Sequence, residues 1–444
     1  MTPAVATIWW VRRDIRLRDN PALAAAQAEG RTVGVFPWTP GIDLWPNRRR
    51  SYLAASLTAF DEAIGGRLCV RRGTAADVIL HAAKDLGARL VVASEEHSPT
   101  GIRTQLEVGA TLQREGVRLE FVGDAYAAPP GSVSKADDSE YLVFSAFHRS
   151  WLSHGIASPF PVADPSFLLA MSSTVDLESE IRMGKTESPP PEKPPTPGEE
   201  QALLRLRAFV ESGLTTYAED RDRPDRTGTS KLSVALAFGE IHPRTVIAAT
   251  RPVSGDGARA YERQLSWRDF HADTLWRHPE ALEKPLTPVF TPSIPVRQGR
   301  AEALFDAWRE GRTGYPFVDA GMRELAVTGG MGNRARMVSA SFLVKDLHLP
   351  WQLGADHYRR TLLDYDPAQN QMNWQWVAGT GRDASPFFRV FNPLAQQRRF
   401  DSDGTYVSRW VPEHGSDAYP EPIVDHAVER RIALLGHRRA RRRA

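Results

Sequence analysis

Two tryptophans separated by a single residue, Trp374 and Trp376, lie in the amide-rich stretch QNQMNWQWVAGTG at residues 369–381. A core position explains Trp374 tolerably, but a core has no need of the amides and glycines around the pair. Tryptophans that face a polar pocket are good stacking platforms for flat π-systems, including nucleobases. Because Asn370 adds an uncharged amide four residues before Trp374, the stretch indicates a pocket for a flat, polar ligand.

A second cluster of polar side chains lies in RTGTSKLSVALAFGEIHPR, where Thr229, Ser230 and Ser233 open a predicted amphipathic helix. Hydroxyl groups together with free backbone N–H groups at a helix start form an anion site that suits phosphate. A simple N-cap with a polar first turn explains the same residues and stays open as an alternative. Tyr217 and Arg268 would add an aromatic wall and a counter-charge to a phosphate site.

Polar and charged residues form two further groups in the second half of the chain. The stretch GNRARMVSASFLVKDL places Asn333, Arg334 and Arg336 on a predicted helix that then becomes apolar. Surface arginines whose stems lie along apolar surface are the alternative for one of them. Asp364 and Asp366 precede the amide-rich stretch with little apolar periodicity around them. The sequence has no Cys/His cluster at metal-ligand spacing, so no metal is expected.

The elements that must hold these residues change in character along the chain. Residues 1–125 alternate short apolar runs with amphipathic stretches. The runs ATIWWV, TVGVFPW, RLCVRRG, RLVVAS and RLEFVGD predict five buried strands. Alternation of strands and helices with short connections predicts a doubly wound parallel sheet. No G-x-G-x-x-G follows the first strand, so a dinucleotide bound in the usual way at this sheet is disfavoured.

The rest of the chain has a different pattern. Residues 126–200 are predicted to be loop-like, and six prolines in the nine positions 189–197 exclude helix or strand there. Helical periodicity then takes over, as in EQALLRLRAFVES and RAEALFDAWREG. We therefore predict an α/β domain over residues 1–130, an interdomain linker over 131–200 and a helical domain over 201–444.

Length and composition limit the class of protein. A chain of 444 residues exceeds what one hydrophobic core usually supports, and 41% hydrophobic with 25% charged residues is typical of a globular protein. The single cysteine, Cys69, excludes an internal disulfide and suits a reducing cytosol, so a cytoplasmic location is expected. No apolar run reaches membrane-spanning length, and the first residues lack a secretory signal pattern, so no membrane partner is expected.

The net charge of +2 conceals an asymmetry between the two halves. Residues 1–200 hold 21 Lys+Arg and 25 Asp+Glu, a charge of −4, whereas residues 201–444 hold 35 and 29, a charge of +6. A basic second half that ends in GHRRARRRA indicates a polyanion partner, although a solvated basic tail explains the charge equally well.

Several long motifs together carry a resemblance to a known family. They are WWVRRDIRLRDNPAL, VFSAFHRSW, TGTSKLS, QLSWRDF, TGYPFVDAGMREL, GNRARM and NWQWVAGTGRDASPFFRVFNP. The chain resembles the photolyase/cryptochrome flavoproteins over nearly its whole length and in the expected order, most closely the class I cyclobutane pyrimidine dimer photolyases. The resemblance implies a five-stranded α/β antenna domain, a helical domain that binds FAD and DNA, UV-damaged DNA as the partner, and a monomer.

In that family a U-shaped FAD lies in the helical domain. Motif positions imply that the cofactor is bound by Tyr217, Thr229, Ser230, Lys231, Leu232, Ser233, Arg268, Arg336, Asp364, Tyr365, Asp366 and Asn370. The hydroxyl stretch would hold the phosphates and ribityl chain, with Arg268 near the pyrophosphate. Asp364 and Asp366 would face the isoalloxazine and the adenosine, with Arg336 paired to Asp364. Asn370 corresponds to the residue opposite flavin N5, where an amide resembles the DNA-repair members and fits a fully reduced, anionic flavin.

The resemblance also assigns roles to the tryptophans. Trp374 matches the indole next to the flavin, the first relay for photoreduction, and Trp351 matches the second. Trp376 and Trp267 match the two aromatic walls against which a flipped-out lesion lies. The implied catalytic residues are Asn370, Trp374, Trp351 and Gln264. The implied DNA contacts are Gln264, Trp267, Asn333, Arg334, Met337, Trp376 and Arg389.

The implied activity is light-driven repair of cyclobutane pyrimidine dimers by electron transfer from excited, reduced FAD, as in a deoxyribodipyrimidine photo-lyase. Asn333 and Met337 favour this lesion, because (6-4) enzymes carry histidines in the segment GNRARM. Gln264 is a departure, since cyclobutane-dimer enzymes usually have glutamate there and (6-4) enzymes usually have glutamine. A (6-4) photolyase and a cryptochrome-type photoreceptor without repair activity are therefore the alternatives.

The sequence does not decide two accessory features of the family, the antenna chromophore and the third relay tryptophan. An antenna chromophore is expected in the α/β domain, and a deazaflavin with Arg49 beside its cleft is favoured over methenyltetrahydrofolate. Thr100 replaces the acidic residue associated with folate binding, and an empty site is the other alternative. The family's third relay tryptophan falls near Gln298, but residues 284–300 contain no Trp or Tyr, so slow flavin photoreduction is expected.

Overall fold

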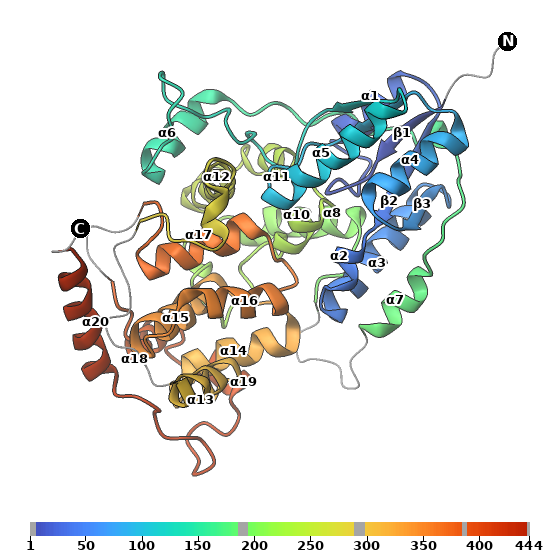
Figure 1. Ribbon diagram of the computed structural model, residues 1–444. Helices are drawn as coiled ribbons and strands as arrows, with labels where there is room; N and C mark the ends of the chain where they lie inside the picture. The colour runs from blue at the N-terminus through green and yellow to red at the C-terminus, as the bar shows by residue number, and fades with distance from the viewer. Residues whose placement is uncertain (1–5, 185–193, 288–297, 384–388, 442–444) are drawn as a thin grey trace.

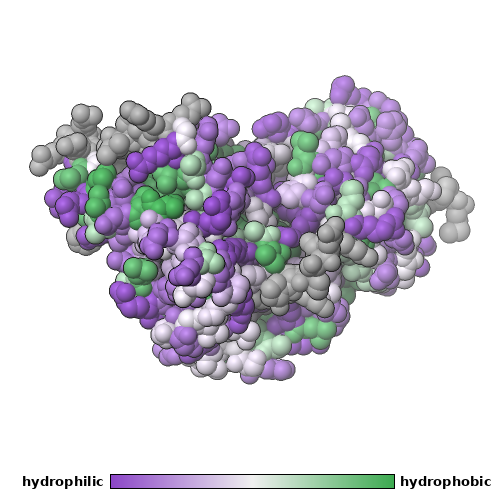
Figure 2. All heavy atoms as spheres, turned by 90° about the horizontal axis from the view of Figure 1, so that it is seen from below, coloured by the Kyte–Doolittle hydropathy of each residue, from purple (hydrophilic) through white to green (hydrophobic). Residues whose placement is uncertain are grey.

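The computed structural model describes residues 6–184, 194–287, 298–383 and 389–441. A sheet domain formed by the first third of the chain lies beside a larger assembly of helices (Figure 1). This arrangement confirms the predicted fold class, an α/β domain followed by a mostly helical domain. Figure 2 shows one face of the molecule, where hydrophilic side chains predominate and hydrophobic ones form separate small patches.

Five parallel strands form the sheet, in the order β3-β2-β1-β4-β5. Their bounds are β1 Thr7–Trp10, β2 Thr32–Trp38, β3 Leu68–Arg72, β4 Leu90–Ala93 and β5 Arg118–Phe121. Ile8 of the central strand is paired with Val33 on one side and with Val91 on the other. The number of strands and their parallel direction agree with the sequence prediction.

Helices cover both faces of the sheet, as expected for a doubly wound fold. Trp9 packs in a core cluster with residues of α1 (Pro21–Ala28) and α3 (Asn47–Ala63). Its neighbours Ile8 and Trp10 pack in the opposite cluster, with residues of α4 (Ala75–Leu86) and α5 (Pro99–Arg114). This alternation follows from the two-residue period of a strand. The short helix α2 (Pro40–Asp43) follows β2.

Two sequence predictions about this half of the chain are wrong. Strand β5 was expected to be buried, but Arg118, Glu120 and Phe121 are exposed because β5 is an edge strand with one neighbour. The loop expected over residues 126–200 contains the helices α6 (Phe144–His154), η1 (Pro165–Phe167) and α7 (Leu177–Met183). Helix α6 forms because three aromatic side chains at helical spacing, Phe144, Phe147 and Trp151, are buried together. Most of the proline run lies outside the described residues.

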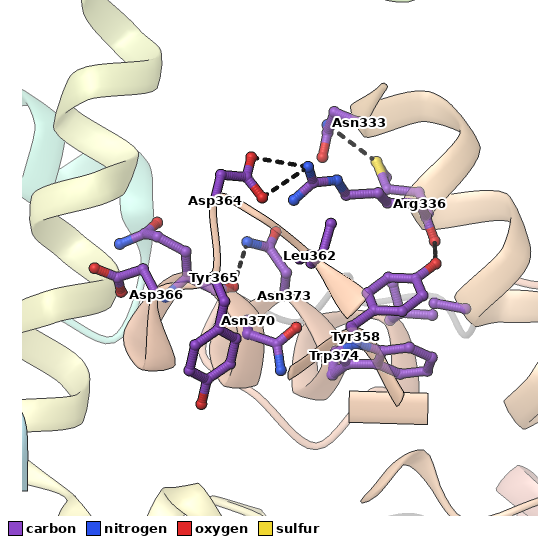
Figure 3. Close-up of a pocket in the computed structure, with 14 residues that line it drawn as sticks. Asn333, Arg336, Tyr358, Leu362, Asp364, Tyr365, Asp366, Asn370, Asn373 and Trp374 are labelled. Atoms are coloured by element: carbon purple, nitrogen blue, oxygen red, sulfur yellow. Dashed lines mark hydrogen bonds and ion pairs between the residues drawn. The ribbon is translucent and has the colours of Figure 1, made fainter. Parts of the chain in front are cut away.

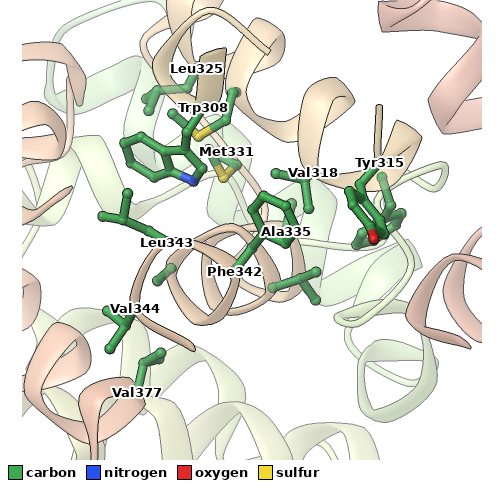
Figure 4. Close-up of a cluster of buried hydrophobic side chains, with 14 of the residues drawn as sticks. Trp308, Tyr315, Val318, Leu325, Met331, Ala335, Phe342, Leu343, Val344 and Val377 are labelled. Atoms are coloured by element: carbon green, nitrogen blue, oxygen red, sulfur yellow. The ribbon is translucent and has the colours of Figure 1, made fainter. Parts of the chain in front are cut away.

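The remaining helices build the second domain. They are α8 (Glu199–Ala208), η2 (Phe209–Gly213), α9 (Tyr217–Asp220), α10 (Ser233–Phe238), α11 (Pro243–Thr250), α12 (Asp256–Arg277), η3 (Pro279–Leu282), α13 (Gln298–Arg309), α14 (Pro316–Thr328), α15 (Asn333–Ser341), η4 (Phe342–Asp346), α16 (Trp351–Thr361), α17 (Pro367–Ala378), α18 (Pro393–Phe400), α19 (Thr405–Trp410) and α20 (His426–Arg441). Trp308, Phe342 and Leu343 are fully buried in its largest core cluster (Figure 4). Among the described residues, no helix is both long and apolar enough to cross a membrane.

Hydrogen bonds and ion pairs connect the two domains. Asp19, which follows β1 and has a left-handed backbone (φ 51°), accepts a hydrogen bond of 2.7 Å from Arg244 of α11. Arg13 reaches across to Asp366, with 2.7 Å between Nη2 and Oδ2. Because Asp366 begins α17, the sheet domain helps to fix the helix that carries the two tryptophans of the amide-rich stretch.

Candidate active site

A cavity in the helical domain, named here the inner cavity, collects many of the residues singled out in the sequence (Figure 3). It lies between α15, α16, α17 and the loop that precedes α17. Its lining residues are Asn333, Arg336, Met337, Ala340, Tyr358, Leu362, Asp364, Tyr365, Asp366, Gln369, Asn370, Asn373, Trp374 and Val377. The sequence-predicted residues Arg336, Asp364, Asp366, Asn370 and Trp374 therefore share one cavity.

An ion pair forms one wall of the inner cavity. Arg336 Nη2 lies 2.9 Å from Asp364 Oδ2 and 3.1 Å from Oδ1 (Figure 3). Arg336 Nε donates to the backbone carbonyl of Met331. Burial alone would lower the pKa of Arg336, but the Asp364 carboxylate outweighs it and raises the pKa. The pair thus presents a fixed positive and negative group to a ligand.

Asn370 is buried on the first turns of α17, and its amide nitrogen is fully engaged. Nδ2 donates to the Ala355 carbonyl at 3.0 Å and to Gln371 Oε1 at 2.8 Å. Because both amide hydrogens are committed within the protein, Asn370 can offer only its oxygen to a ligand, as an acceptor. It has no acidic proton to transfer.

Asp366 has a structural role at the start of α17 in addition to lining the cavity. Its Oδ1 accepts hydrogen bonds from the backbone N–H groups of Ala368 and Gln369, which caps the helix. Burial by itself raises the pKa of Asp366, but the charges of Arg13 and Arg268 outweigh it and lower the pKa. Asp366 is therefore a stable carboxylate.

Trp374 is held by packing. Its ring centroid lies 5.0 Å from that of Tyr358 and 6.2 Å from that of Trp308, both edge to face. A Cβ atom at Gly354 would overlap the far edge of the Trp374 indole. The indole Nε1 is buried and has no hydrogen-bond partner among the described residues. Trp351, the predicted second relay, is buried at the start of α16, three residues before Gly354.

A second, more basic cavity adjoins the first and is named here the outer cavity. Asn333 lines both. The other residues around the outer cavity are Tyr217, Arg221, Arg223, Pro224, Arg226, Thr227, Thr229, Lys231, Gln264, Glu324, Gly332, Arg334 and Arg409. Many arginines around one hollow make it suitable for an anionic partner.

Two predicted lesion contacts that line the outer cavity, Gln264 and Arg334, are paired with Arg221 and with its neighbour Asp222. Gln264 Oε1 accepts a hydrogen bond of 3.0 Å from Arg221 Nη2. Arg334 Nη2 lies 2.7 Å from Asp222 Oδ2, and its guanidinium stacks over the Phe400 ring at 4.3 Å. Sequence reasoning missed Arg221 and Asp222. The four-residue spacing between Tyr217 and Arg221, which places them on one side of a helical turn, was the available signal for Arg221.

The hydroxyl stretch does not open a helix in the way the sequence predicts. Helix α10 begins only at Ser233, an exposed residue, and Leu232 before it is buried. Thr229 and Ser230 therefore lie in the preceding loop, where Tyr261 donates a hydrogen bond of 2.8 Å to Ser230. Tyr261 is a further residue that sequence reasoning missed.

Arg268 is buried near this loop. Its Nη1 donates to the Ala125 carbonyl at 2.6 Å and its Nη2 to the Leu236 carbonyl at 3.4 Å. The guanidinium also lies over the Tyr126 ring at 4.7 Å. Arg268 thus connects the helical domain to the end of the sheet domain, and its predicted contact with a pyrophosphate stays a prediction.

Three of the remaining predicted DNA contacts, Trp267, Trp376 and Arg389, are not among the described lining residues of either cavity. Trp267 and Trp376 are half-buried, and Trp267 stacks on Phe144 at 3.7 Å between ring centroids. Met337 lines the inner cavity and accepts a weak contact of 3.6 Å from Asn333 Nδ2. The Arg389 side chain is exposed.

A third cavity, of about 340 Å³, lies between the sheet and the helical domain and is named here the interdomain cavity. Arg49 lines it, with its guanidinium 4.5 Å from the Trp45 ring and 5.2 Å from the Tyr365 ring. Burial lowers the pKa of Arg49 to about 10, and Arg49 Nε has no hydrogen-bond partner among the described residues. Tyr365 lines both this cavity and the inner one, so a single loop separates them.

Comparison with known proteins agrees with this geometry. Residues 7–166 match the sequence profile of the DNA photolyase family, and residues 261–416 match the FAD binding domain of DNA photolyase. The chain is 40% identical to a deoxyribodipyrimidine photo-lyase of Thermus thermophilus, over 96% of each protein, and 35% identical to one of Agrobacterium fabrum, over 97% of each.

Solved structures show the same likeness. A bacterial class III photolyase from Agrobacterium tumefaciens superimposes with a TM-score of 0.90 at 33% identity, covering all of this chain and 99% of the other. An archaeal photolyase from Sulfolobus tokodaii, which contains two FAD molecules, gives a TM-score of 0.83 at 26% identity over 98% and 99% of the two chains. The fold and the site thus define a two-domain flavoprotein. The chain belongs to the DNA photolyase family.

The residues of the inner cavity fit FAD. A flavin ring system needs a buried, partly polar slot, and the Arg336–Asp364 pair, the Asn370 oxygen and the Trp374 indole supply one. Thr229 and Lys231 in the adjoining outer cavity are suited to the phosphates. Within the described residues, no group of three or more His, Cys, Asp or Glu side chains could hold a metal ion.

Proposed function

We propose that the protein is a deoxyribodipyrimidine photo-lyase, a light-driven enzyme that repairs cyclobutane pyrimidine dimers in DNA. The observation that carries this proposal is the position of Asn333, which lines both the inner and the outer cavity. A ligand bound beside Arg336 and Asn370 therefore lies next to any base that enters the basic outer cavity. Such proximity favours electron transfer from a flavin to a damaged base.

The cofactor carries the chemistry and the protein holds it in place. When bound, reduced FAD excited by near-UV or blue light supplies the electron that splits the cyclobutane ring and then returns. Asn370 offers a neutral oxygen and no acidic proton, so it stabilises an N–H group without protonating the ring system. The Arg336–Asp364 pair would supply fixed charges to the bound cofactor, and Trp374 would close the slot by packing.

The outer cavity would bind the lesion after it leaves the duplex, because damaged and poorly stacked bases cost little to extrude. Arg334 and Arg221 would neutralise phosphates near the lesion, which makes the binding salt-dependent. Arg334 is paired with Asp222 through Nη2 at 2.7 Å, so a DNA phosphate would either compete with this carboxylate or bind the other guanidinium N–H groups. Gln264 has its oxygen held by Arg221 and donates one long hydrogen bond of 3.4 Å to the Ala260 carbonyl, so its other amide N–H is the part available to pyrimidine carbonyls.

Gln264 also favours a second candidate, a (6-4) photolyase, because that class usually has glutamine at this position. The two candidates are separated by one experiment. The purified protein is assayed on oligonucleotides that carry a single defined lesion of either type, under blue light and in darkness, with its absorption spectrum recorded first. Light-dependent repair of the cyclobutane dimer supports the proposal. Repair of the (6-4) lesion alone supports the second candidate, and binding without repair in light supports a photoreceptor.

We also propose that the interdomain cavity binds an antenna chromophore of the flavin or deazaflavin type. Its position supports this, because Tyr365 lines both cavities and a chromophore there would lie close to the flavin. Arg49 stacks between two aromatic rings and has an unpartnered Nε, a suitable partner for an acceptor on a planar chromophore. Extraction of the bound chromophores and their absorption spectra test the assignment, with Arg49→Ala expected to lose the antenna and to retain the FAD of the helical domain.

A further inference from the structure

Asp383 joins the two aromatic walls of the expected lesion pocket. It lies shortly after α17, seven residues beyond Trp376, and its backbone carbonyl accepts a hydrogen bond of 3.2 Å from Trp376 Nε1. This bond fixes the rotation of an indole that is otherwise half-exposed. The Asp383 backbone is left-handed, with φ of 53°, a conformation that Asn, Asp and Gly adopt most readily.

The same residue also binds the segment that leads into α6. The Asp383 N–H donates to the Leu142 carbonyl at 3.0 Å, and Asp383 Oδ1 accepts from the Phe144 N–H at 3.2 Å. The carboxylate therefore supplies the acceptor for a backbone N–H at the first residue of α6. One residue thus makes three hydrogen bonds to two segments that are far apart in the sequence.

Phe144 completes the connection to the opposite wall. Its ring stacks on Trp267 with 3.7 Å between centroids and an angle of 9° between planes. Phe144 is almost fully buried, and its ring covers one face of the Trp267 indole. Trp376, Asp383, Phe144 and Trp267 form a continuous chain of contacts.

We infer that Asp383 and Phe144 are positioning residues that set the separation and orientation of Trp267 and Trp376, and thereby the discrimination of damaged from undamaged DNA. The inference rests on the proposed function, in which both indoles contact the flipped lesion. Rings that are held at the required spacing before the ligand arrives lose less conformational freedom on binding, so preorganised walls bind the lesion at a smaller entropic cost.

The test compares Asp383→Gly with Asp383→Asn. Both replacements tolerate the left-handed backbone, but only asparagine keeps a side-chain oxygen for the Phe144 N–H. We expect Asp383→Gly to weaken binding of a dimer-containing oligonucleotide by about tenfold, within the range seen when base–aromatic stacking is lost. Binding of undamaged DNA and the amount of bound FAD should not change, and Asp383→Asn should restore most of the discrimination. The loss should appear in KM and not in kcat.

Phe144→Leu provides an independent variant, because it removes the stacked ring and keeps apolar volume. Like Asp383→Gly, this variant should bind damaged DNA less selectively than the wild-type protein does. Equal losses of damaged and undamaged DNA binding, or loss of FAD, would show that Asp383 has a merely structural role and would overturn the inference. So would wild-type discrimination in Asp383→Gly.

A readout without DNA separates this inference from the proposed function. In protein labelled with fluorotryptophan, the 19F resonance of Trp376, assigned through Trp376→Phe, should shift in Asp383→Gly and return in Asp383→Asn. An unchanged resonance would count against the positioning role. If the wild-type protein shows no preference for either lesion over undamaged DNA, the proposed function is wrong, independently of the 19F result.

Discussion

Gln264 accepts a hydrogen bond from Arg221, with 3.0 Å between Oε1 and Nη2, and this pair fixes how the side chain meets a lesion. A carboxylate at this position would keep the bond to Arg221 through one oxygen and leave the second for a pyrimidine N–H. Charge-assisted hydrogen bonds are roughly twice as strong as neutral ones.

Gln264→Glu is therefore expected to raise the affinity for a cyclobutane dimer or the yield of its repair. The measurement is the dissociation constant of a single-lesion oligonucleotide together with the repair yield per absorbed photon. Loss of all activity in Gln264→Glu, combined with native repair of (6-4) lesions, would show that the substrate assignment is wrong.

Gly354→Ala is expected to displace Trp374. An added Cβ atom would overlap both Trp374 Cη2 and Leu343 Cδ2, and overpacking of a core typically costs about 1–3 kcal/mol. The variant should unfold at lower denaturant concentration and retain less FAD. Gly299→Ala in α13 is the matched control, because its Cβ would meet open space and should stabilise the helix by up to about 1 kcal/mol. Equal behaviour of the two variants would contradict the packing account of Trp374.

Acid should destabilise the fold through buried histidines. Burial lowers the pKa of His242 to about 4, and its hydrogen bond with Asp19 offsets this only in part. In the unfolded chain the pKa is about 6.5. Between these values the unfolded state binds a proton that the folded state does not, so the free energy of unfolding falls as the pH drops from about 6.5 to about 4, by up to about 3 kcal/mol.

Urea unfolding at several pH values checks this expectation. His242→Asn should reduce the slope of stability against pH without abolishing it, because burial also lowers the pKa values of His271 and His357 to about 4. If the slope of stability against pH is unchanged in His242→Asn, His242 does not contribute to the loss of stability in acid.

Photoreduction of the flavin is expected to be slow or of low yield. Gln298, near the position of the third relay, begins α13, and most of the aromatic-free segment before it lies outside the described residues. The sequence of that segment contains no Trp or Tyr, so Trp374 and Trp351 alone would leave the electron hole buried. Trp374→Phe should suppress photoreduction further, while repair by chemically reduced enzyme survives.

A tryptophan that packs against Trp374 is an alternative member of the electron relay. Trp308 lies 6.2 Å away between ring centroids, so Trp308→Phe and Trp351→Phe should be compared by transient absorption. Rapid photoreduction that persists in Trp374→Phe and in Trp351→Phe would overturn the relay. Rapid photoreduction lost in both would indicate a surface aromatic reached from another segment.

The sheet could be predicted from sequence because its buried strands are continuous apolar runs between amphipathic helices. Strand β5 was misjudged because burial depends on a neighbour that the run RLEFVGD does not reveal. Helix α6 was missed because its aromatic stripe lies within a segment of loop-like composition.

Some features of the candidate site could be predicted from the sequence and others could not. Residues such as Arg336 and Asp364 were found because local motifs carry them, and they meet in one cavity. The pairing of Gln264 with Arg221 spans 43 residues and that of Asp383 with Phe144 spans 239. Such contacts depend on how helices pack, which no local pattern specifies.

The most direct test of the proposed function is the light-dependent repair rate of an oligonucleotide with one cyclobutane thymine dimer, measured with reduced enzyme. The account predicts repair in blue light, none in darkness, and affinity for the lesion weakened by about 1–3 kcal/mol in Trp376→Ala, with Trp276→Ala on the exposed side of α12 as the control. Absence of repair in light by protein that contains reduced FAD, or wild-type lesion affinity in Trp376→Ala, would contradict it.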